Sequence, residues 1–359
     1  MVRALLATAP GAPLTVREIA LPEPGPGQVR VRIAAAGVCR SDLSFVDGTV
    51  AARYPLVPGH EAAGVVVAAG DGVTRVTAGD RVVLNWAPAC RACWYCQAGE
   101  PYLCERAEPV ARRAWLPDGT PVYGCLGLGA FAEEVVVPEN AVVPLGEGIP
   151  MTVGALLGCA VLTGVGAVRN AAGVRPGQSV LVVGLGGVGL SVLAGARLAG
   201  ADPIIAVDRV PDKEPLARLM GATAFLPASD ALPRRVRELT GGRGADYAFE
   251  CVGTGEAIRA AWSATRRGGH CTVLGVGRAD DLVRLSAREL AHWARTLTAA
   301  VYGAADPDWE LPILARQVRG GVLDLTPLIT DEIGLDGVPA AFERMARGLG
   351  ARSVVVFPA

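Results

Sequence analysis

The sequence predicts an α/β protein of two domains, one built on a doubly wound parallel sheet and the other mostly β. Three observations support this prediction. The chain has 359 residues, which is enough for two domains. Its first 150 residues contain short valine-rich runs separated by glycine and proline, whereas apolar runs alternate with helical patterns from about residue 153 onward. A glycine-rich string at 184–189 directly follows one of those apolar runs.

The composition excludes several classes of protein. Hydrophobic residues make up 51% and charged residues 19%, so the chain can form a large core and is not intrinsically disordered. The net charge of −1 argues against a nucleic-acid or membrane-surface partner. The apolar run at the start of the sequence is too short and too polar for a signal peptide, so we expect a cytoplasmic protein.

Two uncharged segments, 148–168 and 176–196, are each long enough to cross a bilayer. Both are rich in Gly, Thr and Ser, and the second has the pattern of a strand, a turn and a helix. We therefore favour a buried α/β core over a membrane hairpin.

In the first domain, strands are expected at 28–35, 64–69, 81–85 and 133–137. In the second, strands are expected at 179–184, 203–208, 246–251 and 269–275, with helices at 188–199, 212–220, 232–240 and 256–265 between them. The predicted boundaries are 1–152 with 296–359 for the first domain, and 153–295 for the second. A helix near 339–347 and a strand at 353–357 are expected to rejoin the first domain.

The string Gly184-Leu-Gly186-Gly-Val-Gly189 has the spacing of a dinucleotide-binding turn in a Rossmann domain. Gly184 would permit the tight turn, Gly186 would let a pyrophosphate approach, and Gly189 would let helix and strand pack closely. Asp208 lies 19 residues beyond Gly189, at the end of the next strand, where a carboxylate binds ribose hydroxyls and repels a 2′-phosphate. This pattern favours NAD, although Arg209 is placed to bind NADP. The alternative is a structural turn followed by a solvated carboxylate.

Four cysteines form a C-x2-C-x2-C-x7-C cluster: Cys90, Cys93, Cys96 and Cys104. Four thiolates make a closed structural zinc site. An iron–sulfur cluster is the alternative, but the bacterial ferredoxin motif closes after three residues and a proline, not after seven. We therefore favour zinc.

Cys39, His60 and Cys159 are candidates for a second, catalytic zinc site, because two cysteines and one histidine leave the fourth position open. The sequence alone does not bring these three residues together, and buried cysteines with a satisfied histidine remain the alternative. His270 and His292 lie in strand-like and helix-like segments and are interpreted as ordinary packing residues.

The ordered motifs GVCRSD, PGHEAAG, the cluster from Cys90 to Cys104, a helix with Cys159, GLGGVG and AVDR resemble the zinc-dependent medium-chain alcohol dehydrogenase family. The resemblance runs nearly from end to end. It implies a GroES-like catalytic domain and a Rossmann domain, two zinc ions and NAD. It also implies a small alcohol or aldehyde as substrate, and a homodimer, with a tetramer as the alternative.

The resemblance also implies residue roles. Cys39, His60 and Cys159 would bind the catalytic zinc, with Glu61 behind the metal, and the four clustered cysteines would bind the structural zinc. Asp42 would orient His60, and Ser41 would bind the substrate hydroxyl and begin the proton path. The cofactor site would contain Arg40, Gly184, Gly186, Gly187, Val188, Gly189, Asp208, Lys213, Val276 and Arg352.

Two departures from the family pattern affect the chemistry. Horse-liver-type members often carry a relay histidine three residues beyond the serine, where this chain has Ser44, so a relay through Ser44, water or the cofactor ribose stays open. The long segment after Cys104, with LNWAPAC and CLGLGAFAEE, resembles mycothiol-dependent formaldehyde dehydrogenases. In that segment Arg106, Arg112 and Arg113 would bind an acidic thiol adduct or simply be solvated.

The function expected from these features is the NAD-dependent oxidation of an alcohol or the reduction of an aldehyde. Trp86, four residues before Cys90, is either a wall of the substrate pocket or a core residue. The first interpretation favours a primary or aryl alcohol. The alternatives are a mycothiol-dependent formaldehyde dehydrogenase and a non-enzymatic nucleotide-binding protein of the same family.

Overall fold

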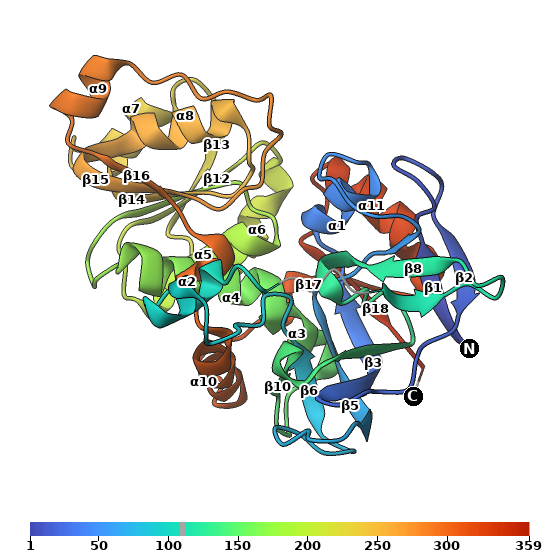
Figure 1. Cartoon of the computed structure of the whole chain (residues 1–359). Helices are drawn as coiled ribbons and strands as arrows, with labels where there is room; N and C mark the ends of the chain where they lie inside the picture. The colour runs from blue at the N-terminus through green and yellow to red at the C-terminus, as the bar shows by residue number, and fades with distance from the viewer. Residues whose placement is uncertain (108–111, 359) are drawn as a thin grey trace. The chain divides into compact units, whose positions relative to one another are not determined.

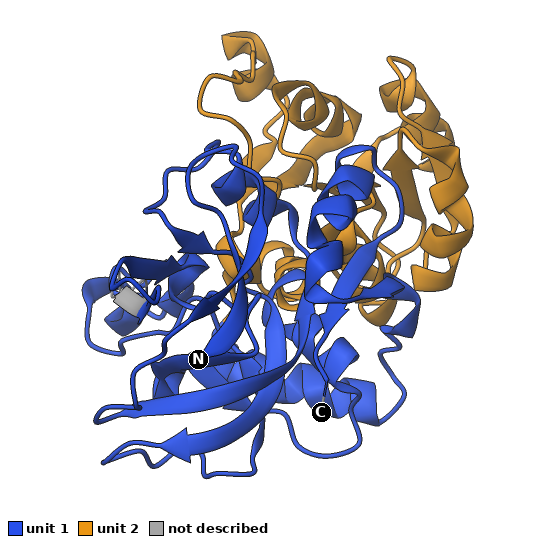
Figure 2. Ribbon diagram, turned by 90° about the vertical axis from the view of Figure 1, so that its right-hand side faces the viewer, with its two compact units in different colours: residues 1–160, 306–359 blue, residues 161–305 orange. Residues whose placement is uncertain are grey.

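The computed structural model describes residues 1–107 and 112–358, and two units are distinguished by their internal contacts (Figure 2). Unit 1 comprises residues 1–160 and 306–359, and unit 2 comprises residues 161–305. The structure thus moves the predicted boundaries by eight and ten residues. The first boundary was hard to place because one helical segment, Met151–Ala172, continues through it without a linker.

Unit 1 contains a sheet in the order β10-β6-β5-β3-β18-β17, with β9 also paired to β3. β3 is the longest strand and buries Val29, Val31 and Ile33, the alternate residues on one face. As predicted, the C-terminal strand β18 joins this sheet, antiparallel to β3. The strands are β3 (Gln28–Gly37), β5 (Ala62–Ala69), β6 (Arg81–Leu84), β9 (Glu134–Pro138), β10 (Val142–Pro144), β17 (Ile329–Ile333) and β18 (Arg352–Val356).

Two smaller sheets also lie in the described part of unit 1. One pairs β1 (Val2–Leu6) with β2 (Thr15–Ile19), and the other has the order β4-β8-β7. The latter strands are β4 (Leu56–Val57), β7 (Arg112–Trp115) and β8 (Pro121–Gly124). The α-helices of this unit are α1 (Arg40–Val46), α2 (Trp94–Gln97), α3 (Met151–Leu156), α10 (Pro307–Arg319) and α11 (Val338–Ala346).

Unit 2 confirms the predicted parallel sheet, with six strands in the order β13-β12-β11-β14-β15-β16. β13 and β16 were not predicted, since each has only four residues and lies at an edge, where a short run gives little periodicity. β16 pairs with β15, and residues 296–305 belong to this unit. The strands are β11 (Val180–Val183), β12 (Ile204–Asp208), β13 (Ala224–Pro227), β14 (Ala245–Glu250), β15 (Thr265–Val273) and β16 (Thr296–Ala299).

Helices cover both faces of this sheet, with α7 and α8 on one side and α4 and α5 on the other (Figure 1). The four helices predicted for this unit each begin and end within two residues of an observed helix. The helices of unit 2 are α4 (Leu162–Gly166), α5 (Gly187–Leu198), α6 (Glu214–Met220), α7 (Leu232–Leu239), α8 (Gly255–Ala264) and α9 (Ala287–His292).

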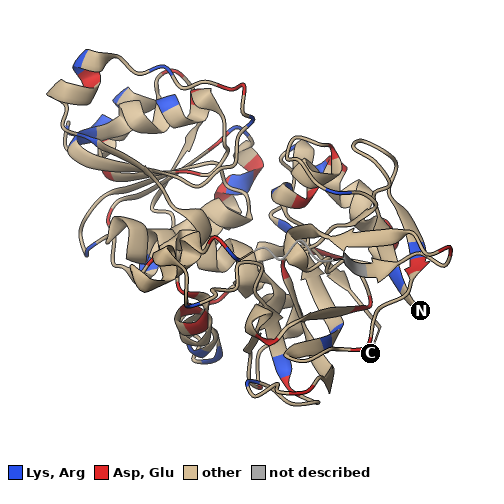
Figure 3. Cartoon of the chain, in the orientation of Figure 1, with Lys and Arg blue, Asp and Glu red and all other residues tan. Residues whose placement is uncertain are grey.

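The two apolar segments both form core elements. The helical segment Met151–Ala172 has a mean hydropathy of 1.9 in its most apolar window, of which 83% is buried inside the protein. Residues 176–196 form β11, the glycine-rich turn and most of α5. Basic and acidic residues are interspersed along the elements of both units, in keeping with the net charge of −1 (Figure 3).

Candidate active site

Asp42 holds two predicted metal ligands in place from the first turn of α1. Its Oδ2 accepts a hydrogen bond from the backbone N–H of Cys39 at 3.2 Å, and its Oδ1 accepts one from the backbone N–H of Gly59 at 2.9 Å. Oδ1 also lies 2.8 Å from Nδ1 of His60. The fully buried carboxylate therefore orients the imidazole with Nε2 turned away from Asp42.

Cys159 approaches His60 from a π-helical stretch, Leu157–Val161, inside the long apolar helix. Such single π turns are frequent at functional sites. The Sγ of Cys159 lies 3.4 Å from His60 Nε2, and the ligand atoms of Cys39, His60 and Cys159 all lie within 4.8 Å of one another. Two ligands of a tetrahedral zinc, one sulfur and one nitrogen, are about 3.5 Å apart, so this spacing fits the metal.

The electrostatics of Cys39 and His60 also fit a bound cation, whereas the hydrogen bond to Cys39 and burial raise the pKa of Cys159 well above its ordinary value. Burial by itself would lower the pKa of His60, but the charge of Asp42 and the two thiols raise it well above its ordinary value. A hydrogen bond from the Cys159 thiol, with the charges of Arg352 and His60, lowers the pKa of Cys39 well below its ordinary value. The same negative field that favours a proton on His60 would stabilise a zinc ion, and thiolates are the forms that bind it.

Glu61 and Arg352 form a buried ion pair next to these ligands. Glu61 Oε1 accepts a hydrogen bond from the Ala160 N–H at 3.1 Å, and its Oε2 lies 3.6 Å from Arg352 Nε. Burial raises the pKa of Glu61 to about 7. Arg352, only 4% exposed, also donates to the Val38 carbonyl at 3.1 Å and lies 3.7 Å from Cys39 Sγ. Its predicted contact with a pyrophosphate stays a prediction.

Cys125 is a further residue of this cluster that the sequence did not reveal. Its Sγ lies within 4.8 Å of ligand atoms of Asp42 and His60. Burial raises the pKa of its thiol to about 12, so it remains protonated at neutral pH. No spacing signal relates it to the other cysteines, because the fold alone brings it to His60.

The four clustered cysteines gather into a second ligand set, again with all four sulfurs within 4.8 Å of one another. The sulfurs of Cys93 and Cys104 are 3.9 Å apart, close to the roughly 3.8 Å expected between two thiolates of a tetrahedral zinc. Hydrogen bonds from backbone N–H groups, the largest from Cys96, lower the pKa of Cys93 to about 6 and so favour its thiolate, whereas burial raises the pKa values of Cys96 and Cys104. The residues fit a closed structural zinc site.

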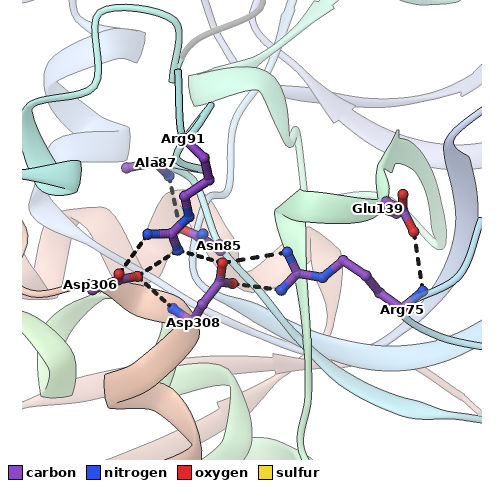
Figure 4. A network of polar contacts seen from close by, with 7 residues as sticks. All are labelled: Arg75, Asn85, Ala87, Arg91, Glu139, Asp306 and Asp308. Atoms are coloured by element: carbon purple, nitrogen blue, oxygen red, sulfur yellow. Dashed lines mark hydrogen bonds and ion pairs between the residues drawn. The ribbon is translucent and has the colours of Figure 1, made fainter. Parts of the chain in front are cut away.

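An ion-pair network fixes the loop between the first two of these cysteines (Figure 4). Arg91 has a positive φ of 61° and donates to both oxygens of Asp306 at 2.6 and 2.7 Å. It also contacts Asp308, whose other side is bound by Arg75 at 2.6 Å. The loop is thereby tied to the first turn of α10, within unit 1.

In unit 2, the glycine-rich turn has the geometry of a dinucleotide site. Gly184 has a φ of +92°, which other residues rarely adopt. A Cβ on Gly189 would lie 1.9 Å from the Gly184 carbonyl oxygen, whereas a Cβ on Gly186 would meet no atom within 4 Å. The turn therefore has no space for a side chain at Gly189, where strand and helix pack, but has free space beside Gly186. Gly187 and Val188 begin α5, whose free N–H groups attract a phosphate.

Asp208 is held against this turn by backbone hydrogen bonds. Its Oδ2 accepts from the Leu185 N–H at 2.7 Å and its Oδ1 from the Val210 N–H at 3.0 Å. Lys213 donates to the Leu185 carbonyl at 3.1 Å and lies 3.7 Å from Asp208 Oδ2. The fold thus brings both predicted ribose ligands to one place, with Arg209 exposed beside them.

Comparisons with known proteins agree with this geometry. Residues 25–147 match the family model described as an alcohol dehydrogenase GroES-like domain, and residues 187–316 match that of a zinc-binding dehydrogenase. An S-(hydroxymethyl)glutathione dehydrogenase of Escherichia coli O1:K1 is 35% identical over 98% of this chain and 99% of its own length. The chain belongs to the zinc-containing medium-chain alcohol dehydrogenase family.

The fold of this alcohol dehydrogenase family member is similar to two solved structures. The benzyl alcohol dehydrogenase of Acinetobacter calcoaceticus has a TM-score of 0.92 and 27% identity, with 99% of each chain covered. A putative zinc-binding dehydrogenase of Sinorhizobium meliloti 1021, bound to NADP, has a TM-score of 0.84 and 27% identity, also over 99% of each chain. The protein is therefore a zinc-dependent oxidoreductase that uses a nicotinamide cofactor.

The remaining predicted site residues of this dehydrogenase are found in different surroundings. Ser41 is half-buried at the start of α1, and Arg40 beside it is exposed. Ser44 is buried, and its hydroxyl donates to the Arg40 carbonyl at 3.3 Å. Trp86 meets His60 edge-on, with the two ring centroids 6.3 Å apart.

Arg106 and Val276, two further residues predicted to contact substrate or cofactor, are exposed at the surface. Arg106 is exposed, while the side chains of Arg112 and Arg113 lie outside what the structure describes. Val276 is 66% exposed and lies three residues after the end of β15, in the same unit as the glycine-rich turn.

Proposed function

We propose that this protein oxidises an alcohol with NAD and catalyses the reverse reduction of an aldehyde. The convergence of Cys39, His60 and Cys159 carries the proposal, because these three ligands leave one position of a tetrahedral ion for a substrate oxygen. A zinc ion held by these residues would supply a Lewis acid that polarises the substrate oxygen. The nicotinamide cofactor supplies the hydride acceptor.

The chain's own residues have three tasks in this scheme. Asp42 fixes the imidazole of His60 in a single orientation, through its 2.8 Å contact with Nδ1. Ser41, two residues after Cys39, accepts a hydrogen bond from the substrate hydroxyl and passes its proton outward. Asp208 and Lys213 bind the adenosine ribose and thereby orient the cofactor.

Selectivity for NAD is supported by Asp208. Its carboxylate is locked by two backbone N–H groups, so it cannot turn away from an incoming 2′-phosphate. The relative from Sinorhizobium meliloti binds NADP, and the exposed Arg209 is the group that would favour this cofactor here.

The test of this selectivity is kcat/KM for NAD and NADP in wild type and Asp208→Ala. Loss of the charged acceptor should weaken NAD binding roughly 10–100-fold and raise the relative use of NADP. A wild-type enzyme with the higher kcat/KM for NADP would contradict the proposal.

For the substrate, we propose a primary or aryl alcohol. The half-buried indole of Trp86 beside His60 supports this class, since an aromatic wall binds apolar rings. The name of the benzyl alcohol dehydrogenase relative is consistent with it.

The second candidate is oxidation of a thiol adduct of formaldehyde, formed with mycothiol or glutathione. The relative named S-(hydroxymethyl)glutathione dehydrogenase favours it, and the sequence of the segment after Cys104 points the same way. A panel of aliphatic, aryl and polyol substrates, followed by NADH formation, separates the two candidates. Formaldehyde oxidation that requires mycothiol or glutathione would select the second.

A further inference from the structure

Glu250 is a buried acid of unit 2 to which the proposed mechanism gives no task. It is the last residue of β14, where the register sets it beside Val183 of β11 and Val273 of β15. Its side chain is fully buried. Burying a carboxylate is costly unless hydrogen bonds compensate, so its hydrogen-bond partners matter.

The carboxylate binds the loop that immediately follows it. Oε1 accepts hydrogen bonds from the N–H groups of Val252 and Gly253, at 2.7 and 2.8 Å. Oε2 is buried and makes no hydrogen bond within the described part of the chain. One oxygen of Glu250 therefore fixes two successive peptide groups of the loop 251–253.

That loop packs against the glycine-rich turn with no room to spare. A Cβ on Gly184 would lie 2.5 Å from Cγ2 of Val252 and 3.3 Å from the carbonyl carbon of Cys251. The N–H of Cys251 also donates to the carbonyl of Val183, the residue before Gly184, at 2.8 Å. A displaced loop would therefore displace the turn.

On its other side the loop packs, backbone on backbone, against the segment after β15. A Cβ on Gly275 would lie 2.0 Å from the nitrogen of Gly253, and a Cβ on Gly277 would lie 2.5 Å from the carbonyl oxygen of Gly253. This segment carries the exposed Val276. The loop thus lies between two segments, each of which holds residues predicted to contact the cofactor.

We propose that Glu250 is a positioning residue of the cofactor site: its carboxylate fixes loop 251–253 as a spacer that sets the distance between the glycine-rich turn and Val276. The inference rests on the proposed nicotinamide-dependent function and adds to it a residue that does not touch the cofactor. The role requires a side chain that is long enough to bring a hydrogen-bond acceptor to the N–H groups of Val252 and Gly253. It does not require a negative charge.

This mechanism makes opposite predictions for two variants. Glu250→Gln keeps an acceptor oxygen at the same length, so its dissociation constant for NADH should stay within about threefold of wild type. Glu250→Ala frees the two N–H groups and the loop, and its dissociation constant should rise about tenfold or more. Glu250→Met, which fills the volume without an acceptor, replaces the alanine variant if that variant does not fold.

The experiment is a fluorescence titration of full-length, zinc-loaded protein with NADH and NADPH, combined with hydrogen exchange at the amides of Val252 and Gly253. Val236→Ala is the matched control, because it removes buried atoms from α7, which packs against α8 and β13 in the same unit. It should lower the melting temperature without changing the dissociation constant. Exchange at the two amides should accelerate in Glu250→Ala and remain slow in Glu250→Gln.

Three results would overturn the proposal. The first is a folded Glu250→Ala or Glu250→Met variant that binds the coenzyme within twofold of wild type. The second is a loss of coenzyme affinity in Glu250→Gln as large as that in Glu250→Ala, which would show that the negative charge of Glu250 is needed. The third is failure of both acceptor-free variants to fold, which would make Glu250 a folding determinant. A wild-type protein that binds neither coenzyme would refute the proposed function itself, and preference for NADPH would refute only the coenzyme choice.

Discussion

At the scale of single residues, the carboxylate of Asp42 contacts both segments that carry the first two ligands of the catalytic metal. One oxygen binds the N–H of Cys39, and the other binds His60 and the N–H of Gly59. The residue could be predicted from the sequence only through the family resemblance, because Asp42 and His60 are 18 positions apart. Its double contact became visible only in the fold.

Asp42→Ala should weaken zinc binding at the catalytic site by about 10–100-fold, the usual effect of removing a group that orients a ligand. The imidazole of His60 would lose the partner that fixes its orientation. Competition with a chromophoric chelator measures this affinity. Ser44→Ala, on the same helix and also buried, is the control and should retain zinc like wild type.

Ser41 and Ser44 should differ sharply in their contribution to turnover. Ser41→Ala should lower kcat by about 10²–10⁴-fold, because it removes the group proposed to take the substrate proton. Ser44→Ala should cost less than about tenfold, since its hydroxyl already donates within α1 and water can pass a proton in its place. The kcat values of both variants test this ranking. Comparable losses in the two would show that Ser44 is an essential relay.

At the scale of elements, the loop of the four cysteines combines a metal site with an ion-pair network. The cysteine spacing identified the metal site from sequence alone, because all four ligands lie within 15 residues. The partners of Arg91 could not be predicted, since Asp306 and Asp308 are more than 200 positions away. Short-range spacing is readable in a sequence, whereas long-range pairing depends on the fold.

Loss of a cysteine ligand should therefore destabilise unit 1 far more than loss of Arg91. Cys104→Ser removes folding energy supplied by the metal. Arg91→Ala removes half-exposed ion pairs, each with a stability contribution of about 1 kcal/mol or less, and this effect should shrink at high salt. Melting temperatures at low and high salt test the ranking, with the exposed Arg234→Ala as control. An arginine effect as large as the cysteine effect would contradict it.

The start of β14 contains a pH-dependent contact. Burial alone would raise the pKa of Asp246, but hydrogen bonds from Ser179 and Arg266 outweigh it and lower the pKa below its ordinary value. A carboxylate with a lowered pKa in the folded state stabilises the protein above about pH 4. This stabilisation is lost as the pH falls through the folded-state pKa.

Asp246→Asn should accordingly reduce the free energy of unfolding by about 1–3 kcal/mol at pH 7. The difference from wild type should diminish below pH 4, because the wild-type carboxyl is then protonated as well. Urea denaturation at several pH values measures it. A difference that is independent of pH would show that the charge of Asp246 contributes nothing.

At the scale of the whole molecule, the sequence patterns predicted the two-unit architecture, the parallel sheet and the four-cysteine set, whereas the set of Cys39, His60 and Cys159 was predicted through the family resemblance. The glycine spacing and the alternation of strands and helices are local patterns, and they placed four of the six strands of unit 2. The contacts of Arg352 with Glu61, and of Cys125 with His60, arise only when distant segments fold together. The homodimer and the cytoplasmic location stay predictions, because they depend on surfaces and surroundings beyond one folded chain.

The zinc content of the fully loaded protein tests the central claim most directly. Elemental analysis should give two zinc ions per chain for wild type. It should give one for Cys39→Ala, which should remain folded but inactive because only the catalytic site is lost. One zinc ion or fewer in loaded wild-type protein would contradict the assignment of Cys39, His60 and Cys159 as a catalytic site beside the structural four-cysteine site.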